Sequence, residues 1–221
     1  MIYVVTYWPE QGLKVIILGL TGSIGMGKTT AAKVFRALGV PVHDADLNVH
    51  RLMQADGAAF DAVAAAFPGV EKNGVIDRQA LGERVFGDDS KLKQLENVLH
   101  PLVRQKERHF LAVAARRGER LVVLDIPLLL ETGGDHRCDG VVVVSAPLVI
   151  QKKRVLKRPG MTEQRLQSIL KRQIDDKIKC RMADFIVRTG LGRSHSLREI
   201  ANIAKVTQSW RPRHWSPACN I

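Results

Sequence analysis

A glycine-rich stretch followed by lysine and threonine is the clearest chemical signal in this sequence. Residues 22–29 read Gly-Ser-Ile-Gly-Met-Gly-Lys-Thr, which fits a glycine, any four residues and then Gly-Lys-Thr. A loop of this kind aims several backbone N–H groups at one polyphosphate, because glycine adopts the required backbone angles and permits close approach. Lys28 is expected to reach the outer phosphates, and the Thr29 hydroxyl to bind Mg²⁺.

The segments on either side of this loop must hold it in place. An apolar run over residues 15–20 predicts a buried strand before it, and Ala31, Phe35 and Leu38 recur at helical spacing after it, up to Gly39. The alternative is a glycine-rich turn that carries a surface lysine. Eight matching positions between a strand and a helix favour the binding of a nucleoside triphosphate.

Two carboxylates follow the next short strand, which is expected over residues 40–43. Ligands bind outside the carboxyl edge of parallel sheets, so Asp44 and Asp46 could act as a base for a hydroxyl nucleophile or as a partner for metal or ribose. Either aspartate could instead be the N-cap of a helix that begins near Leu47. The sequence around them leaves both interpretations open.

Residues 47–117 are predicted to be nearly continuous helix, long enough to hold a substrate. Asp77 is expected to cap one helix, and His100-Pro101 to end one and begin the next, because a residue before proline is disfavoured in helical conformation. Taken alone, His100 is more typical of a capping or core histidine than of a ligand, and Arg104 of a solvated surface charge.

A second acid stands at the end of a continuous apolar run over residues 121–124. Asp125 occupies the position of the second metal-binding acid of phosphate-loop enzymes, although a turn residue before Pro127 is the alternative. Further strands are expected at 141–144 and 185–187. A capping box at Ser196 and Glu199 predicts the start of the last helix.

Basic residues are concentrated between Lys152 and Arg181, a segment that contains eleven Lys or Arg and only three acidic residues. Two helices are expected here, one carrying Arg154 and Arg158 a turn apart and one opened by Thr162 with Glu163. Such a pair resembles a lid that closes over phosphates. Most of the eleven charges are expected to be solvated; Arg154 and Arg158 are the candidates for nucleotide contact.

The net charge of +12 and pI near 10 indicate an acidic partner, either a nucleic acid, a membrane surface or a phosphorylated small molecule. Three widely spaced cysteines predict neither a disulfide framework nor a zinc site, and a cytoplasmic location is expected. No apolar stretch is long enough for a membrane span, and the first residues lack a basic leader. Residues 1–13 could form an edge strand, but an extension is the preferred interpretation, and residues 210–221 are expected to be loosely ordered.

The predicted fold class is α/β, with a parallel sheet of the P-loop NTPase type flanked by helices, an inserted helical acceptor-binding region and a helical lid. A GTP switch would need an Asn-Lys-x-Asp motif, which is not present. A nucleic-acid binder would interleave aromatics with its basic residues, and aromatics are only 5% here. The parts present are those of a small-molecule kinase.

Six motifs, in order, resemble the dephospho-CoA kinase family: residues 19–29, 39–46, 100–104, 125–132, 153–158 with 172–173, and 183–186. The resemblance implies ATP-dependent phosphorylation of the ribose 3′-hydroxyl of dephospho-CoA, with Mg²⁺ as cofactor and with neither nucleic acid nor membrane as partner. The oligomeric state is left open, with a monomer compatible. Glu131 matches the family pattern without an assigned role, whereas Arg188-Thr189 departs from it and puts any nucleotide contact there in doubt.

The resemblance implies roles for particular residues. Asp44, Lys28 and Arg154 would be catalytic, and Asp46, His100 and Arg104 would bind the acceptor. Thr29 and Asp125 would hold the metal. The nucleotide would contact Gly22, Ser23, Ile24, Gly25, Met26, Gly27, Lys28, Thr29, Thr30 and Arg158. The expected regions are a nucleotide-binding core (14–46, 118–150 and 183–209), the acceptor region (47–117), the lid (151–182) and extensions (1–13 and 210–221).

Overall fold

The computed structural model describes residues 14–85 and 87–215. Contacts divide the chain into two units, one formed by residues up to 42 and from 111 onward, the other by His43–Phe110. The expectation for residues 1–13, and that for 216–221, lie outside the described residues. Among the described residues, no helix has the length and apolar character needed to cross a membrane.

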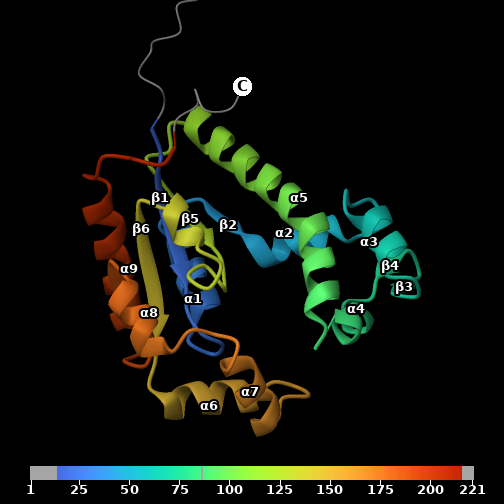
Figure 1. Cartoon of the computed structure of the whole chain (residues 1–221). Coiled ribbons are helices and arrows are strands. Elements are labelled where there is room, and N and C mark those ends of the chain that lie inside the picture. The colour runs from blue at the N-terminus through green and yellow to red at the C-terminus, as the bar shows by residue number, and fades with distance from the viewer. Residues whose placement is uncertain (1–13, 86, 216–221) are drawn as a thin grey trace, which may run out of the picture. The chain divides into compact units, whose positions relative to one another are not determined.

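A parallel sheet organises the first unit (Figure 1). Its strand order is β2-β5-β1-β6-β7, and β1 pairs in parallel with both β5 and β6, as does β6 with β7. Every residue of β1 and of β5 is buried, as expected of strands covered on both faces. The predicted α/β class is therefore confirmed. The strands are β1 (Ile16–Thr21), β2 (Val42–Asp44), β5 (Leu121–Asp125), β6 (Gly140–Ser145) and β7 (Phe185–Arg188). Strand β2 crosses the boundary between the units, since His43 and Asp44 belong to the second.

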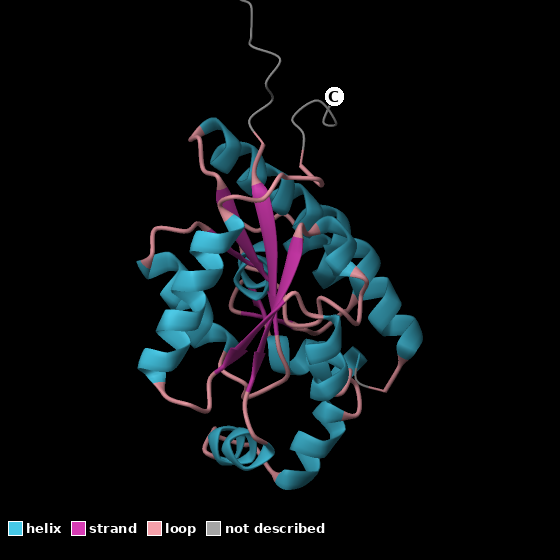
Figure 2. Ribbon diagram, turned by 90° about the vertical axis from the view of Figure 1, so that its left-hand side faces the viewer, coloured by secondary structure: helices cyan, strands magenta, loops and turns pink. Residues whose placement is uncertain are grey.

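Helices surround these strands (Figure 2). They are α1 (Lys28–Ala37), α6 (Leu148–Leu156), α7 (Glu163–Leu170), α8 (Asp176–Met182), α9 (Arg193–Thr207) and the short 3-10 helix η1 (Gly134–Arg137). The main core lies where α1 and α9 pack on the sheet, with Phe35 and Ile200 fully buried against Leu18 and Val142. As predicted, Gly39 follows the end of α1, and the Thr162 side chain caps α7.

The capping-box prediction at the last helix is wrong. Helix α9 begins at Arg193, so Ser196 lies inside it, and its hydroxyl donates back to the Gly192 carbonyl. The Glu199 carboxylate instead accepts from the backbone N–H of Arg188 at the end of β7. Glu199 thus links α9 to the strand that precedes it and does not complete a capping box.

The segment after α9 is also better ordered than predicted. The Trp210 ring stacks on Phe185 at 5.5 Å between centroids, and Trp215 is buried. The Arg213 N–H donates to the buried Asp139 carboxylate, whose other oxygen accepts from Ile17 of β1. These contacts attach residues 210–215 to the sheet, although their sequence has no periodicity.

The second unit contains α2 (Ala45–Leu52), α3 (Phe60–Ala66), a hairpin of β3 (Glu71–Lys72) and β4 (Val75–Ile76), and α4 (Arg78–Val85). It also contains α5 (Asp89–Arg116) as far as Phe110; the last residues of this helix belong to the first unit. Its own core includes the fully buried Val63 and Val70. The predicted cap at Asp77 is confirmed, since its side chain accepts from Gln79 and Ala80.

Two predictions for this unit are wrong. It is not nearly continuous helix, because a β-hairpin turns at Asn73 and Gly74, which both have positive φ. Helix α5 does not break at Pro101 but continues from Asp89 to Arg116. Proline removes one backbone hydrogen bond, at a typical cost of about 3 kcal/mol, and the apolar stripe through Leu95, Leu99 and Leu102 packs into the core on both sides of it.

Candidate functional site

The glycine-rich loop connects β1 to α1, as the sequence predicts. Gly25 and Gly27 have φ of 78° and 101°, in the left-handed region that favours glycine. A Cβ on Gly25 would lie 2.4 Å from a methyl group of Val155. The loop therefore requires glycine at this position for two reasons, backbone angle and space, and α1 begins directly after it with Lys28.

Lys28 and Asp125 meet at the carboxyl end of the sheet. The Lys28 Nζ lies 2.6 Å from Asp125 Oδ1, and Asp125 is only 3% exposed. Asp125 is the last residue of β5 and pairs with Leu20 near the end of β1. The pairing of the two strands therefore places the acid next to the point where the loop begins. A lysine held by a buried acid beside a phosphate-type loop is an arrangement suited to polyphosphate. Thr29 is exposed on the first turn of α1.

Arg154 of α6 lies against the loop. Its guanidinium donates to the Thr189 hydroxyl and carbonyl, both at 2.9 Å, and to the Gly25 and Met26 carbonyls at 3.4 and 3.5 Å. The Thr189 hydroxyl also donates to the Met26 carbonyl. Sequence reasoning assigns Thr189 no role in the site, because positions 188 and 189 differ from the family pattern. That departure was the available signal, since a hydroxyl there can bond both the loop and Arg154.

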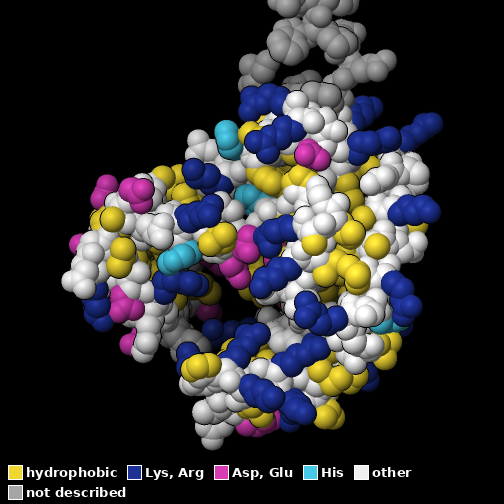
Figure 3. Space-filling view, turned by 180° about the vertical axis from the view of Figure 1, so that it is seen from behind, with side chains coloured by type: hydrophobic (Ala, Val, Ile, Leu, Met, Phe, Trp, Pro, Cys, Tyr) yellow, Lys and Arg dark blue, Asp and Glu magenta, His cyan; other side chains and the backbone are white. Residues whose placement is uncertain are grey.

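Arg158 is exposed and lies just beyond the end of α6 at Leu156. Basic side chains gather at the lower end of Figure 3, where α6 and α7 lie. Most of the basic residues between 152 and 181 are exposed, in agreement with a solvated face. Lys179 is the exception: it is fully buried and pairs with Glu131 at 2.6 Å.

The remaining candidates belong to the other unit. Asp44 is the last residue of β2 and the N-cap of α2, where its Oδ1 accepts from the Leu47 N–H at 2.9 Å. Asp44 therefore is the N-cap that its position in the sequence allowed. Asp46 is exposed in the first turn of α2. His100 and Arg104 are both exposed on α5 and stand four residues apart, so they share one face of the helix.

His43 precedes Asp44 and is buried. Its ring packs against Phe110 with 5.1 Å between centroids. Burial lowers the pKa of His43 to about 4, and the neighbouring Asp44 carboxylate only partly opposes this shift. His43 is therefore neutral at physiological pH.

This pKa predicts a specific loss of stability in acid. An unfolded histidine binds its proton near pH 6.5, so below that pH the unfolded chain takes up a proton that the folded chain does not. Between about pH 7 and about pH 4.5, we expect the free energy of unfolding of the wild type to fall by about 2 kcal/mol more than that of His43→Gln, which has no such group to protonate. Urea unfolding at both pH values measures this. His136→Gln, at an exposed histidine, is the control; equal pH dependence in wild type and His43→Gln would contradict the prediction.

The chain matches a family of known enzymes over most of its length. Residues 16–192 match the family model for dephospho-CoA kinase. The dephospho-CoA kinase of Paramagnetospirillum magneticum is 62% identical over 72% of this chain and 76% of the relative. That of Mesorhizobium japonicum is 55% identical over 84% of this chain and 93% of the relative.

Solved structures agree with the sequence comparisons. A crystal structure from Thermus thermophilus has a TM-score of 0.78 and 34% identity, covering 89% of this chain and 99% of that protein. The dephospho-CoA kinase from Campylobacter jejuni has a TM-score of 0.57 and 25% identity, covering 86% of this chain and 96% of that protein.

Proposed function

This chain belongs to the dephospho-CoA kinase family, and we propose that it transfers the terminal phosphoryl group of ATP to dephospho-CoA, giving coenzyme A and ADP. The observation that carries the proposal is the family match over residues 16–192, which includes a loop with the geometry of a phosphate cradle. The acceptor atom we propose is the 3′-hydroxyl of the ribose.

We propose that residues Gly22 to Thr30 bind the ATP phosphates. The first turn of α1 offers N–H groups without helical partners and the positive end of the helix dipole. Lys28 adds a cation that Asp125 holds at the foot of the loop. Phosphoryl transfer requires little covalent work from protein groups, so positioning and charge compensation supply most of the rate.

The donors beside the loop fit Mg²⁺, which is commonly bound by one or two carboxylates and substrate phosphates rather than by a protein cage. Asp125 and the Thr29 hydroxyl would hold it. The ion, when bound, would neutralise charge on the phosphate oxygens.

Asp44 is the proposed base or orienting acid for the acceptor hydroxyl. It is partly exposed, and the Leu47 N–H fixes one of its oxygens. A hydrogen-bonded carboxylate with a fixed direction is suited to accepting a hydroxyl proton during transfer.

We assign acceptor binding to residues 47–117 and to Asp46, His100 and Arg104. The exposed pair His100 and Arg104 could bind the anionic groups of dephospho-CoA. Residues 151–182 are the proposed lid, with Arg154 supplying charge near the transferred group and Arg158 contacting the nucleotide. Lid closure would exclude water, which otherwise competes with the ribose hydroxyl.

A coupled assay for ADP release tests the proposal. The purified chain is supplied with ATP, Mg²⁺ and one acceptor at a time: dephospho-CoA, pantothenate, shikimate or a nucleoside monophosphate. We expect turnover with dephospho-CoA alone, and chelation of Mg²⁺ should abolish it. Turnover confined to another acceptor would retain the kinase class but overturn the proposed substrate.

A further inference from the structure

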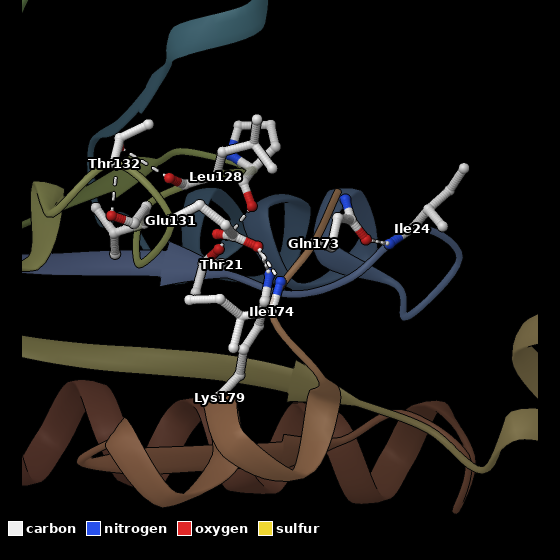
Figure 4. A network of polar contacts seen from close by, with 10 residues as sticks. Thr21, Ile24, Leu128, Glu131, Thr132, Gln173, Ile174 and Lys179 are labelled. Atoms are coloured by element: carbon white, nitrogen blue, oxygen red, sulfur yellow. Dashed lines mark hydrogen bonds and ion pairs between the residues drawn. The ribbon is translucent and has the colours of Figure 1, made fainter. Parts of the chain in front are cut away.

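Both backbone polar groups of Ile24, in the phosphate loop, are bound by glutamine side chains. The Ile24 carbonyl accepts from Gln151 Nε2 at 2.8 Å. The Ile24 N–H donates to Gln173 Oε1 at 3.1 Å (Figure 4). Gln151 belongs to α6 and is 2% exposed, whereas Gln173 lies between α7 and α8. Two separate parts of residues 151–182 therefore hold the two successive peptide groups on either side of the Ile24 Cα, Gln173 the one before it and Gln151 the one after it.

The backbone decides which end of each glutamine is used. A carbonyl only accepts hydrogen bonds and an N–H only donates, so Gln151 must present its NH₂ group and Gln173 its oxygen. The two residues thus have opposite requirements, even though they are chemically identical.

Gln173 is itself held by its neighbour in the chain. The Ile174 N–H donates to Glu131 Oε1 at 3.0 Å, and the same oxygen lies 2.6 Å from Lys179 Nζ (Figure 4). Because Lys179 is fully buried, this ion pair has a fixed geometry and little freedom to reach solvent. Glu131, which matched the family pattern without a role, thereby fixes the backbone next to Gln173.

Two more carbonyls of the loop accept hydrogen bonds from side chains. Arg154 donates to the Gly25 and Met26 carbonyls, and Thr189 to that of Met26. A loop that binds polyphosphate must point N–H groups at the ligand and keep its carbonyl oxygens away, because an oxygen facing a phosphate is repelled. Donors that hold three successive carbonyls favour that orientation.

We propose that Gln151 and Gln173 are positioning residues that hold the two peptide groups flanking the Ile24 Cα, and with them the phosphate loop, in the orientation that binds the nucleotide polyphosphate. The inference rests on the proposal that this loop binds ATP. It assigns to residues 151–182 a function in shaping the loop, in addition to supplying charge.

Substitutions at the two glutamines test the proposal, because they can keep or remove the acceptor oxygen of Gln173 and can remove the donor NH₂ group of Gln151. Gln173→Glu keeps an acceptor oxygen, whereas Gln173→Leu removes it. Gln151→Glu loses the donor, and Gln151→Leu removes the whole amide. Calorimetry measures the dissociation constant for ATP, and the coupled assay measures the KM for dephospho-CoA. The melting temperature of each variant shows whether it is folded.

We expect Gln173→Leu to weaken ATP binding about tenfold, the usual scale for losing one hydrogen bond and freeing a loop. The KM for dephospho-CoA should stay within about twofold. Gln173→Glu should restore ATP binding to within about threefold of wild type, whereas Gln151→Glu should bind ATP at least as weakly as Gln151→Leu. Gln164→Glu, at an exposed position of α7, is the matched control for adding a negative charge to this region.

Wild-type ATP binding is measured first, so that the two proposals fail separately. If the wild type does not bind ATP, the assignment of the phosphate site fails. If it binds ATP but Gln173→Leu binds equally well, the positioning role alone is overturned. Equal weakening by Gln173→Leu and Gln173→Glu, beyond that of Gln164→Glu, also overturns it, as does a matching rise in the KM for dephospho-CoA. If the buried Gln151 variants fail to fold, the two variants at the partly exposed Gln173 decide the question.

Discussion

Replacing Lys28 with methionine is expected to lower kcat/KM for ATP by about three orders of magnitude and to weaken ATP binding about tenfold. Methionine keeps most of the apolar stem of Lys28 but removes the ammonium group that lies 2.6 Å from Asp125. During transfer, charge develops on the oxygens around the breaking phosphate bond, so a cation that stabilises it acts mainly in the transition state, and its loss should reduce kcat more than affinity. Steady-state kinetics and calorimetry measure the two effects separately.

Lys33→Met is the matched control for Lys28, since Lys33 is an exposed lysine on the same helix. It should leave kinetics within about twofold of wild type, as expected for a solvated surface charge. If Lys28→Met retained more than about a tenth of wild-type turnover, Lys28 would not be the main cation on the phosphates.

The parts of the fold that the sequence predicts are those specified by local patterns. Continuous apolar runs predict β1, β5 and β6, and the glycine-lysine-threonine spacing predicts the loop between β1 and α1. Each of these signals lies within about ten residues and reflects either burial on both faces of a strand or the backbone angles of glycine.

Two errors in the second unit had usable signals in the sequence. Asn73-Gly74 is a favoured two-residue hairpin turn, because both positions require positive φ. The stripe through Leu95, Leu99 and Leu102 keeps helical spacing across Pro101, which indicates one helix rather than two. In the first case the Asn-Gly turn, and in the second the leucine spacing, is a stronger indicator of the structure than the helical or proline pattern beside it.

The contacts around Ile24 could not have been predicted from one sequence. Gln151 lies 127 residues from Ile24 along the chain, and Gln173 lies 149 residues away. Glutamine carries no periodic or spacing signal for such a pairing, and most glutamines are exposed. The burial of Lys179 could not be predicted either, because most basic residues in its segment are exposed and its partner Glu131 is distant in the sequence.

Asp44→Asn is expected to reduce kcat by about two to three orders of magnitude while ATP binding stays within about twofold of wild type. Asparagine keeps a side-chain oxygen that can accept from the Leu47 N–H, so the cap of α2 should persist. It cannot take up the hydroxyl proton, because the amide has no basicity near neutral pH. Single-turnover kinetics with saturating dephospho-CoA would measure the chemical step directly.

The two roles of Asp44 can be separated by comparing substitutions. Asp44→Ala removes both the charge and the cap, so it should lower the free energy of unfolding by about 1 kcal/mol more than Asp44→Asn does, with a similar loss of turnover. Asp61→Asn, at an exposed acid in the first turn of α3, controls for removing a carboxylate near a helix N-terminus in the same unit. Near-normal turnover by a stable Asp44→Asn protein would reduce Asp44 to the N-cap of α2 and require another group to accept the ribose proton. Loss of turnover without loss of stability would assign the carboxylate a direct role in phosphoryl transfer.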